Sequence, residues 1–249
     1  MESMPAKMNE EEVKTVAVEL EPKEAEHVLQ WAVNKFPRLV ISSSFGLEDV
    51  AIIDMLSRIK TEVKVVTLDT GRLPQETYDV MDAVREKYGI GIEVYFPDTS
   101  SVEKMVKDHG LNLFYKRVEF RKLCCGIRKV EPLRRALSGS DAWITGLRRD
   151  QVQSRTSTGK VEWDADHGGI VKINPLADWN WEKVRRYVDA NKVPYNKLHD
   201  QGYPSLGCAP CTRAVKQGED PRAGRWWWEL GIDKECGIHS VAGKIDRST

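Results

Sequence analysis

Residues 38–72 read RLVISSSFGLEDVAIIDMLSRIKTEVKVVTLDTGR, and this stretch decides the fold. Arg38–Ser42 is a short β-branched run that predicts a strand, Leu47–Ile59 predicts a helix, and Val63–Leu68 predicts a second strand. Strands that alternate with helices in this way predict an α/β protein with a doubly wound, mostly parallel sheet covered on both faces. The alternation continues with a helix over 75–88, a strand over 92–96, helices over 102–108 and 124–137, and a strand over 142–145.

The loops that follow these strands carry small and polar residues. In a parallel sheet, ligands bind beyond the carboxyl ends of the strands, and a helix N-terminus offers free N–H groups to an oxyanion. We therefore predict a nucleotide site at this edge, although each loop by itself also fits an ordinary capped turn between a strand and a helix. The candidate binding residues are Ser42, Ser43, Ser44, Gly46, Leu68, Thr70, Gly71, Arg72 and, after the fourth strand, Gly146.

The composition excludes several classes of function. Among 249 residues, 38 basic and 38 acidic side chains give a formal net charge of zero, so the chain lacks the basic excess of a general nucleic-acid binder. Its start is polar, without a secretory signal, and no apolar run approaches the length of a membrane span. We expect a soluble, cytoplasmic protein that binds neither nucleic acid nor membranes.

Four of the five cysteines fall into two pairs, Cys124-Cys125 and Cys208-Ala209-Pro210-Cys211. In a reducing compartment, such spacing favours metal binding or catalysis over disulfides. Adjacent residues on a helix point about 100° apart, so both thiolates reach one centre only if that centre is bulky. A 4Fe–4S cluster offers a separate iron to each cysteine and fits best, while zinc and unliganded thiols stay open as alternatives.

Two further residues near these cysteines are candidates for catalysis. If residues 124–137 are helical, Lys129 lies one turn beyond Cys125, where a cation would offset the charge of a cluster and reach a bound anion. Cys236 has no partner cysteine, and Lys234 and His239 could lower its pKa, which is the profile of a nucleophile. A solvated surface lysine and a buried structural cysteine are the alternatives.

Arginines gather in two motifs, Gly146–Gln151 followed by Arg155, and Arg222–Glu229. Because a guanidinium binds phosphate or sulfate in a bidentate way, Arg155, Arg222 and Arg225 are predicted to grip an anion, and salt bridges to carboxylates are the alternative. The three consecutive tryptophans, 226–228, are better explained by core packing than by binding.

Five motifs occur together in the order CCGIRK, GLRRDQ, CAPCTR, GRWWWE and KECGIH. In this combination the chain closely resembles, from about residue 36 to 239, the assimilatory adenylylsulfate (APS) reductases, the iron–sulfur branch of the phosphoadenylylsulfate (PAPS) reductase family. The resemblance implies an adenine nucleotide alpha hydrolase-like (ATP pyrophosphatase-type) fold. It implies one 4Fe–4S cluster on Cys124, Cys125, Cys208 and Cys211, a nucleophile at Cys236, and adenosine held by the two loops. It also implies that Lys129 links cluster and substrate, and that Arg155, Arg222, Arg225 and His239 surround the phosphosulfate.

The activity that this resemblance implies is reduction of APS to sulfite and AMP. An S-sulfocysteine would form on Cys236 and be resolved by thioredoxin or a glutaredoxin-like reductant. The alternatives are a PAPS or dual APS/PAPS reductase, an ATP-using adenylating or thiolating enzyme of the same fold, and a metal-bearing binding protein. Members specialised for PAPS generally lack the cluster cysteines, which favours APS.

We accordingly expect three parts in the chain. Residues 1–22 are predicted to be a flexible N-terminal arm with at most one short helix, and residues 23–205 the α/β nucleotide-binding domain. Within that domain, a β-ribbon over 160–172 and a helix over 181–190 follow the sheet. Residues 206–249, which are rich in turns, are the predicted cluster-binding and catalytic segment, and a homo-oligomer is expected because such assemblies are common.

Overall fold

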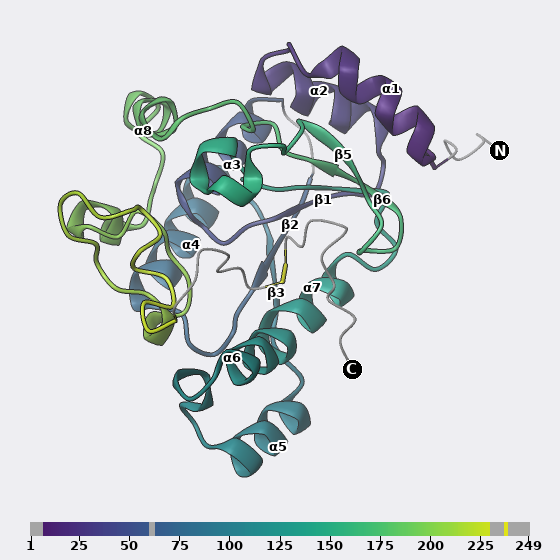
Figure 1. The fold of residues 1–249 in the computed structure, drawn as a ribbon. Coiled ribbons are helices and arrows are strands. Elements are labelled where there is room, and N and C mark those ends of the chain that lie inside the picture. Colours follow the sequence, from purple (N-terminus) through teal and green to yellow (C-terminus); the bar gives the residue numbers. More distant parts are fainter. Residues whose placement is uncertain (1–6, 60–62, 230–236, 239–249) are drawn as a thin grey trace.

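The computed structural model describes residues 7–59, 63–229 and 237–238. Its centre is a six-stranded sheet with strand order β3-β2-β1-β4-β6-β5. All neighbouring strands run parallel except β5, which pairs antiparallel with β6 at one edge (Figure 1). The predicted α/β class with a mostly parallel sheet is therefore confirmed. The strands are β1 (Leu39–Ser42), β2 (Lys64–Leu68), β3 (Ile92–Tyr95), β4 (Ala142–Ile144), β5 (Val161–Asp164) and β6 (Ile170–Ile173).

Alternate residues of the strands face two different hydrophobic layers, because successive side chains of a strand point to opposite faces. Leu39 and Ile41 of β1 belong to the larger layer, whereas Val40 belongs to a smaller one with Trp143 of β4. Helices thus cover both faces of the sheet. The larger layer includes side chains of α1 (Glu10–Leu20), α2 (Ala25–Lys35), α3 (Leu47–Ile59), α4 (Gln75–Tyr88) and α8 (Trp181–Ala190), and the smaller layer includes side chains of α7 (Glu131–Ala136).

The N-terminal region, predicted to be a flexible arm, contains a regular helix in its described part. Asn9 and Glu12 form a capping box at the start of α1, in which each side chain bonds the other residue's backbone N–H. Val13 and Leu20 are buried, and α1 contacts β5. Residues 10–20 therefore pack on the core, since this apolar pair lies on one face of the helix. The described part of the chain has no helix long and apolar enough to cross a membrane.

A single helical rod carries the first cysteine pair, and it is longer than predicted. Instead of a helix over 124–137, α6 (Val118–Cys125) leads into a π-helix over Gly126–Val130 and then into α7. The wider turn accommodates one extra residue, so the cysteines and the residues after them have a different relative rotation than on a continuous α-helix. The helix before this rod, α5 (Thr99–His109), begins three residues earlier than the helix predicted over 102–108.

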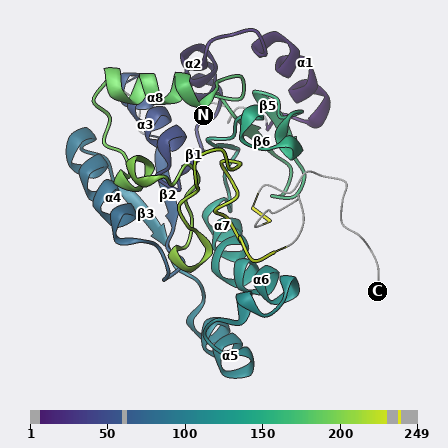
Figure 2. The same cartoon turned by 60° about the vertical axis from the view of Figure 1, so that its left-hand side comes forward.

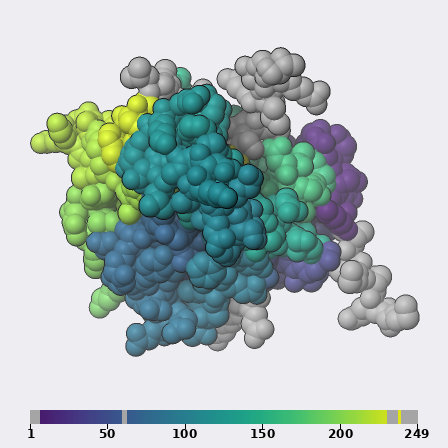
Figure 3. Space-filling view, turned by 90° about the horizontal axis from the view of Figure 1, so that it is seen from below, coloured from purple at the N-terminus to yellow at the C-terminus, as the bar shows by residue number. Residues whose placement is uncertain are grey.

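The segment after Pro194 has little regular structure, with two 3-10 turns at Lys197–Gln201 and Ala209–Cys211. It lies beside α4 and close to α6 (Figures 1 and 2). The Ala209 N–H donates to the Arg72 carbonyl at 2.8 Å, and the Tyr115 hydroxyl donates to the Pro210 carbonyl at 2.7 Å. These bonds tie the second cysteine pair to the loop after β2 and to the 3-10 turn Leu113–Tyr115 that precedes α6. Figure 3 shows the teal helices beside this yellow-green segment.

Candidate functional site

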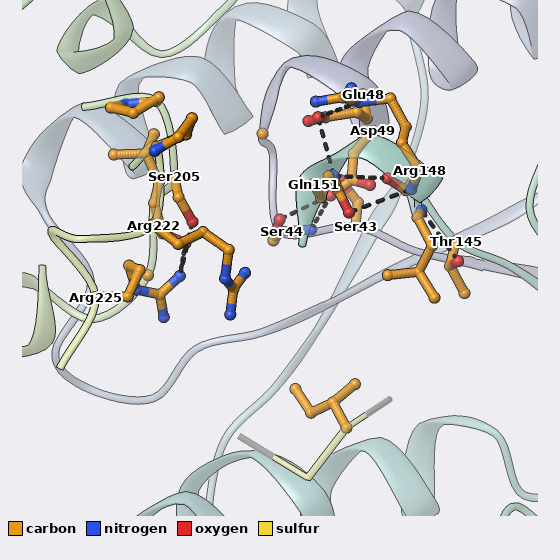
Figure 4. Close-up of a pocket in the computed structure, with 18 of the residues that line it drawn as sticks. Ser43, Ser44, Glu48, Asp49, Thr145, Arg148, Gln151, Ser205, Arg222 and Arg225 are labelled. Atoms are coloured by element: carbon orange, nitrogen blue, oxygen red, sulfur yellow. Dashed lines mark hydrogen bonds and ion pairs between the residues drawn. The ribbon is translucent and has the colours of Figure 1, made fainter. Parts of the chain in front are cut away.

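A cavity of about 500 Å³ opens at the carboxyl ends of β1, β2 and β4, within the size range of small-molecule sites (Figure 4). Three loops of the sheet line it on one side and the segment after Pro194 on the other. We call it the nucleotide pocket. Of the predicted residues, those that line it are Ser42, Ser43, Ser44, Gly46, Leu68, Thr70, Lys129, Gly146, Arg155, Arg222 and Arg225.

The loop after β1 is held by its own side chains. The N–H and the hydroxyl of Ser44 both donate to Asp49, at 2.6 and 2.8 Å, and the Phe45 N–H donates to the Ser43 hydroxyl at 3.0 Å. Gly146 crosses so close to this loop that an added Cβ would lie 2.4 Å from an Asp49 carboxylate oxygen. Only glycine fits at position 146 without moving the start of α3.

Two neighbouring carboxylates at this edge have different environments. Burial raises the pKa of Asp49 to about 6, against the effect of the Ser44 hydrogen bonds. Burial also opposes ionisation of Glu48, but the charge of Arg148 and hydrogen bonds from Arg148 and Gln151 hold its pKa below the usual value. Glu48 is therefore an ion-paired anion, while Asp49 titrates near neutral pH.

The arginines form ion pairs, line the pocket or, in the case of Arg148, do both. Arg148 pairs with Glu48 and Asp150, and Arg149 pairs with Glu21, so for these two the salt-bridge alternative holds. Arg155, which donates to Gln151, lines the pocket. Figure 4 shows Arg222 and Arg225 together across the pocket from Ser43 and Ser44.

Arg225 is fixed by its surroundings in the segment after Pro194. Its Nη1 donates to the Leu206 carbonyl at 2.7 Å and to the Ser205 hydroxyl at 3.3 Å. The guanidinium lies so close to Gly207 that a Cβ there would come within 2.3 Å of its Nη2. The sequence motif GRWWWE identifies Arg225 but gives no sign that Gly207 makes room for it.

All four paired cysteines line a second, smaller cavity, which we call the cysteine cavity. None of these four cysteines is in a disulfide, and the cavity is also lined by Arg72, Arg121, Arg128 and Lys129. Lys129 is shared with the nucleotide pocket, so the two cavities are neighbours. Two residues predicted for the nucleotide site do not line the nucleotide pocket. Gly71 lines neither cavity. Arg72 lines the cysteine cavity, where its guanidinium lies over the Phe114 ring and donates to the Leu111 carbonyl.

The cysteine cavity suits a negatively charged group bound through sulfur. Burial, and then the neighbouring thiols Cys208 and Cys125, raise the pKa of Cys211 to about 12, so four bare thiolates would not coexist there. The Arg128 Nε is buried without a partner in the described part of the chain, although Arg128 Nη1 donates to the Thr70 carbonyl. Among the described residues, no three His, Cys, Asp or Glu side chains are gathered to hold a metal ion. The donor set itself, four thiols beside Arg121, Arg128 and Lys129, has the chemistry to hold an anionic cluster through cysteine sulfur.

Cys236 and His239, the predicted nucleophile and one predicted anion contact, lie outside the described residues. Gly237 and Ile238, which follow Cys236 directly, are described. Ile238 lines the nucleotide pocket and packs against the smaller hydrophobic layer that contains Val40 and Trp143.

Several residues of the pocket were not predicted from the sequence. Glu48, Asp49 and Gln151 lie within motifs that we considered. Only the folded chain shows that all three line the pocket. His199 also lines the pocket, and its Nδ1 is 2.8 Å from the Tyr203 carbonyl while its Nε2 is buried without a partner among the described residues. Burial lowers the pKa of His199, which favours the neutral ring. No local sequence signal identifies this histidine.

The chain is similar to known proteins over most of its length. The family model "Phosphoadenosine phosphosulfate reductase domain" matches residues 38–214. The chain is 47% identical to the adenosine 5'-phosphosulfate reductase of Allochromatium vinosum, over 85% of this chain and 82% of the relative. It is 48% identical to a protein of the same name from Sinorhizobium fredii, over 81% and 80%.

Solved structures share the fold. The phosphoadenylyl-sulfate (PAPS) reductase of Candida auris, in a phosphate complex, superposes with a TM-score of 0.72 at 33% identity, covering 85% of this chain and 100% of that one. FMN adenylyltransferase of Candida glabrata in complex with ATP reaches a TM-score of 0.56 at 11% identity, covering 100% of this chain and 79% of that one, which shows a common fold alone.

Proposed function

The chain belongs to the phosphoadenosine phosphosulfate reductase domain family, and from that premise we propose that it reduces adenosine 5'-phosphosulfate (APS) to sulfite and AMP. One observation carries the proposal. Lys129 lines both the nucleotide pocket and the cavity of four cysteines, so a basic group stands between the place for a nucleotide and the place for a sulfur-bound cluster. An ATP-using enzyme of the same fold does not call for the KECGIH motif that contains Cys236.

The pocket can bind the two ends of APS by different means. The loops after β1 and β2 offer backbone groups and hydroxyls for the nucleoside. Lys129, Arg155, Arg222 and Arg225 supply positive charge for the phosphosulfate. Since AMP is the leaving group, these cations would stabilise the charge that develops on its phosphate oxygen.

The chemical step requires a sulfur nucleophile, and Cys236 is the residue we assign. Its thiolate attacks the sulfur of APS, the bond from sulfur to the phosphate oxygen breaks, and AMP leaves with the electron pair. This gives an S-sulfocysteine on Cys236. A reductant thiolate then attacks the Cys236 sulfur and releases sulfite. The resulting mixed disulfide is resolved by the second thiol of the reductant, which leaves as a disulfide. The packing of Ile238 at the pocket supports this assignment because the nucleophile precedes it by two residues.

Cys124, Cys125, Cys208 and Cys211 would hold the 4Fe–4S cluster. When bound, that cluster supplies fixed negative charge and cross-links the helical rod to the segment after Pro194. Lys129, Arg121 and Arg128 offset negative charge in this cavity. A PAPS or dual APS/PAPS reductase is the alternative, and the four cysteines are the feature that favours APS. Thioredoxin or a glutaredoxin-like reductant, the homo-oligomer and the cytoplasmic location stay predictions from the sequence.

Replacing the nucleophile tests the proposal most directly. Cys236→Ser should keep the iron content and the affinity for AMP, because Cys236 is neither one of the four predicted cluster ligands nor one of the predicted nucleotide-binding residues. It should lose all sulfite release from APS with thioredoxin as reductant. Cys211→Ser is the matched control, and we expect it to lose iron absorption near about 400 nm.

A labelling experiment separates the correct cysteine from the others. Wild-type protein incubated with sulfur-labelled APS and no reductant should carry one sulfonate on the peptide containing Cys236. A label on any other peptide, or sulfite production by the Cys236→Ser variant, would contradict the assignment.

A further inference from the structure

Trp226 lines the nucleotide pocket and packs in one hydrophobic cluster with Cys124, Cys125 and Cys211, and two arginines contact its ring. The guanidinium carbons of Arg225 and Arg121 are each 4.7 Å from a ring centroid of Trp226. Arg225 lines the nucleotide pocket, whereas Arg121 lines the cysteine cavity. We call Arg121, Trp226 and Arg225 the Arg–Trp–Arg stack.

All three side chains of the stack are inaccessible to solvent. The residues are 2%, 2% and 6% exposed, in the order Arg121, Trp226 and Arg225. A cation over a tryptophan ring gains the most when both are desolvated, so these contacts are of the strong kind. Trp226 is also one of three non-glycine residues of the described chain with a positive φ, at +43°, a conformation that persists only where surrounding contacts impose it.

The backbone around Trp226 ties it to the second cysteine pair. Its N–H donates to the Cys211 carbonyl at 3.2 Å, and Arg225 forms an isolated β-bridge with Thr212. A displacement of Cys211 would therefore move the ring on which Arg225 rests.

Arg121 ties the other end of the stack to the first cysteine pair. Arg121 lines the cysteine cavity beside Cys124 and Cys125, and its Nε and Nη2 donate to the Glu229 carboxylate at 2.8 and 2.9 Å. Both members of this ion pair are buried, at 3% and 6% side-chain exposure. Arg121 thus senses the cysteine cavity and has no place in the lining of the nucleotide pocket.

We propose that the Arg–Trp–Arg stack couples the cysteine cavity to the nucleotide pocket, with Trp226 and Arg121 acting as positioning residues for Arg225. This inference rests on the proposed function, since it assigns Arg225 to the anionic part of the nucleotide. The stack is a second connection beside Lys129. The stack acts by fixing the position of the Arg225 guanidinium, whereas Lys129 acts through its own charge. Arg225 needs such support because its remaining contacts are a carbonyl and a hydroxyl through one nitrogen, and its Nε is buried without a partner among the described residues.

The three consecutive tryptophans provide matched variants for a binding test. AMP affinity would be measured by calorimetry on iron-loaded protein, with iron content determined for each variant. Trp226→Leu should weaken AMP binding about tenfold, and Trp226→Phe, which keeps an aromatic face, about twofold to threefold. Trp227→Leu removes a ring that is 40% exposed and packs on Tyr115 and Trp228, so it should leave the affinity unchanged within twofold.

A double-mutant cycle tests whether Arg121 acts through Arg225. Arg121→Gln is combined with Glu229→Gln, so that no buried charge is left unpaired. This pair should weaken AMP binding about fivefold in the wild-type background and less than twofold when Arg225→Gln is also present, because residues that act through one another are not additive.

Equal effects of the Gln pair in both backgrounds, or equal effects of Trp226→Leu and Trp227→Leu at normal iron content, would overturn the coupling and leave the proposed function intact. Failure of the iron-loaded wild type to bind AMP would overturn both.

Discussion

Asp49 and Glu48 are adjacent in sequence and both buried, yet their local contacts give them opposite ionisation behaviour. Glu48 receives a guanidinium and an amide, which favour its charged form. Asp49 receives the N–H and hydroxyl of Ser44 and the backbone N–H of Gly46, and these neutral donors do not offset its burial. The pH response of the nucleotide pocket is therefore predicted to come from Asp49.

Asp49 should make the folded protein less stable as the pH rises from about 4 to about 6. Its pKa of about 6 in the folded state exceeds the ordinary value of about 3.9, so within this window the folded state binds more protons than the unfolded state, and stability falls with increasing pH. A difference of two pKa units corresponds to about 3 kcal/mol as an upper estimate. This loss of stability is essentially complete once the pH exceeds the folded-state pKa of about 6, and the stability difference stays constant at higher pH.

Urea unfolding of wild type and Asp49→Asn, at several pH values from 4.5 to 7.5, measures this contribution. Asn can accept the Ser44 hydrogen bonds but does not titrate, so the variant should gain in stability relative to wild type as the pH rises. All other carboxylates are common to both proteins and cancel. Parallel stability curves for the two proteins would contradict the raised pKa.

At the scale of elements, α6, the π-helix and α7 form one helical rod that carries Cys124, Cys125 and Lys129. The turns of this rod set the relative directions of the three side chains, and therefore whether they can face one bound group. The π-helix at Gly126–Val130 inserts one extra residue into the turn that directly follows Cys125. Such bulges often occur at functional sites because they change the relative direction of side chains on either side. Here the change brings Lys129 to line both cavities.

Deleting Gly126 should convert the π turn to an α turn and separate the two groups. The cysteine pair would rotate by about 100° relative to Lys129 and α7, so we expect iron binding to be lost while the helical circular dichroism is retained. Gly126→Ala is the matched control, since an added Cβ meets no atom within 4 Å and the chain length is kept. Iron content and absorption near about 400 nm report the result. A deletion variant with full iron content would mean that the wider turn is not required.

At the scale of the whole molecule, the proposed function places binding and chemistry in different parts of the chain. Apart from Ile238, the described residues that line the two cavities lie between Ser42 and Trp226, whereas the assigned nucleophile is at position 236. Of the residues beyond Glu229 that the structure describes, Ile238 alone packs against a hydrophobic layer, and it is only partly buried.

A chain that ends at Glu229 should consequently fold, take up iron and bind AMP, but release no sulfite from APS. Loss of the partly buried Ile238 should cost at most about 2 kcal/mol, which corresponds to a few degrees in the midpoint of thermal unfolding. The full-length Cys236→Ser variant is the control, because it lacks turnover without losing the segment. A truncated chain that no longer binds AMP would show that the segment beyond Glu229 also builds the nucleotide site.

The sequence by itself determined the α/β class, the positions of the parallel strands and the grouping of four cysteines into two pairs along the chain. Strand and helix periods are local, and the β-branched runs at residues 39–42 and 64–68 form β1 and β2 because their residues favour extended chain and are buried on both faces. Most of the residues that the motifs predicted for the nucleotide site do line the nucleotide pocket, since the carboxyl ends of parallel strands meet at one edge.

The tertiary structure alone decided how the cations are used. Arg148 and Arg149 look as suitable for an anion as Arg225 does, but they pair with Glu48 and Glu21, about 100 residues or more away in the chain. Arg72, predicted in the nucleotide site, lines the cysteine cavity, and Trp226 contacts Arg121 from far along the sequence. Ion pairs and ring contacts depend on distances of a few ångströms between segments that only the folded chain brings together, so no local pattern encodes them.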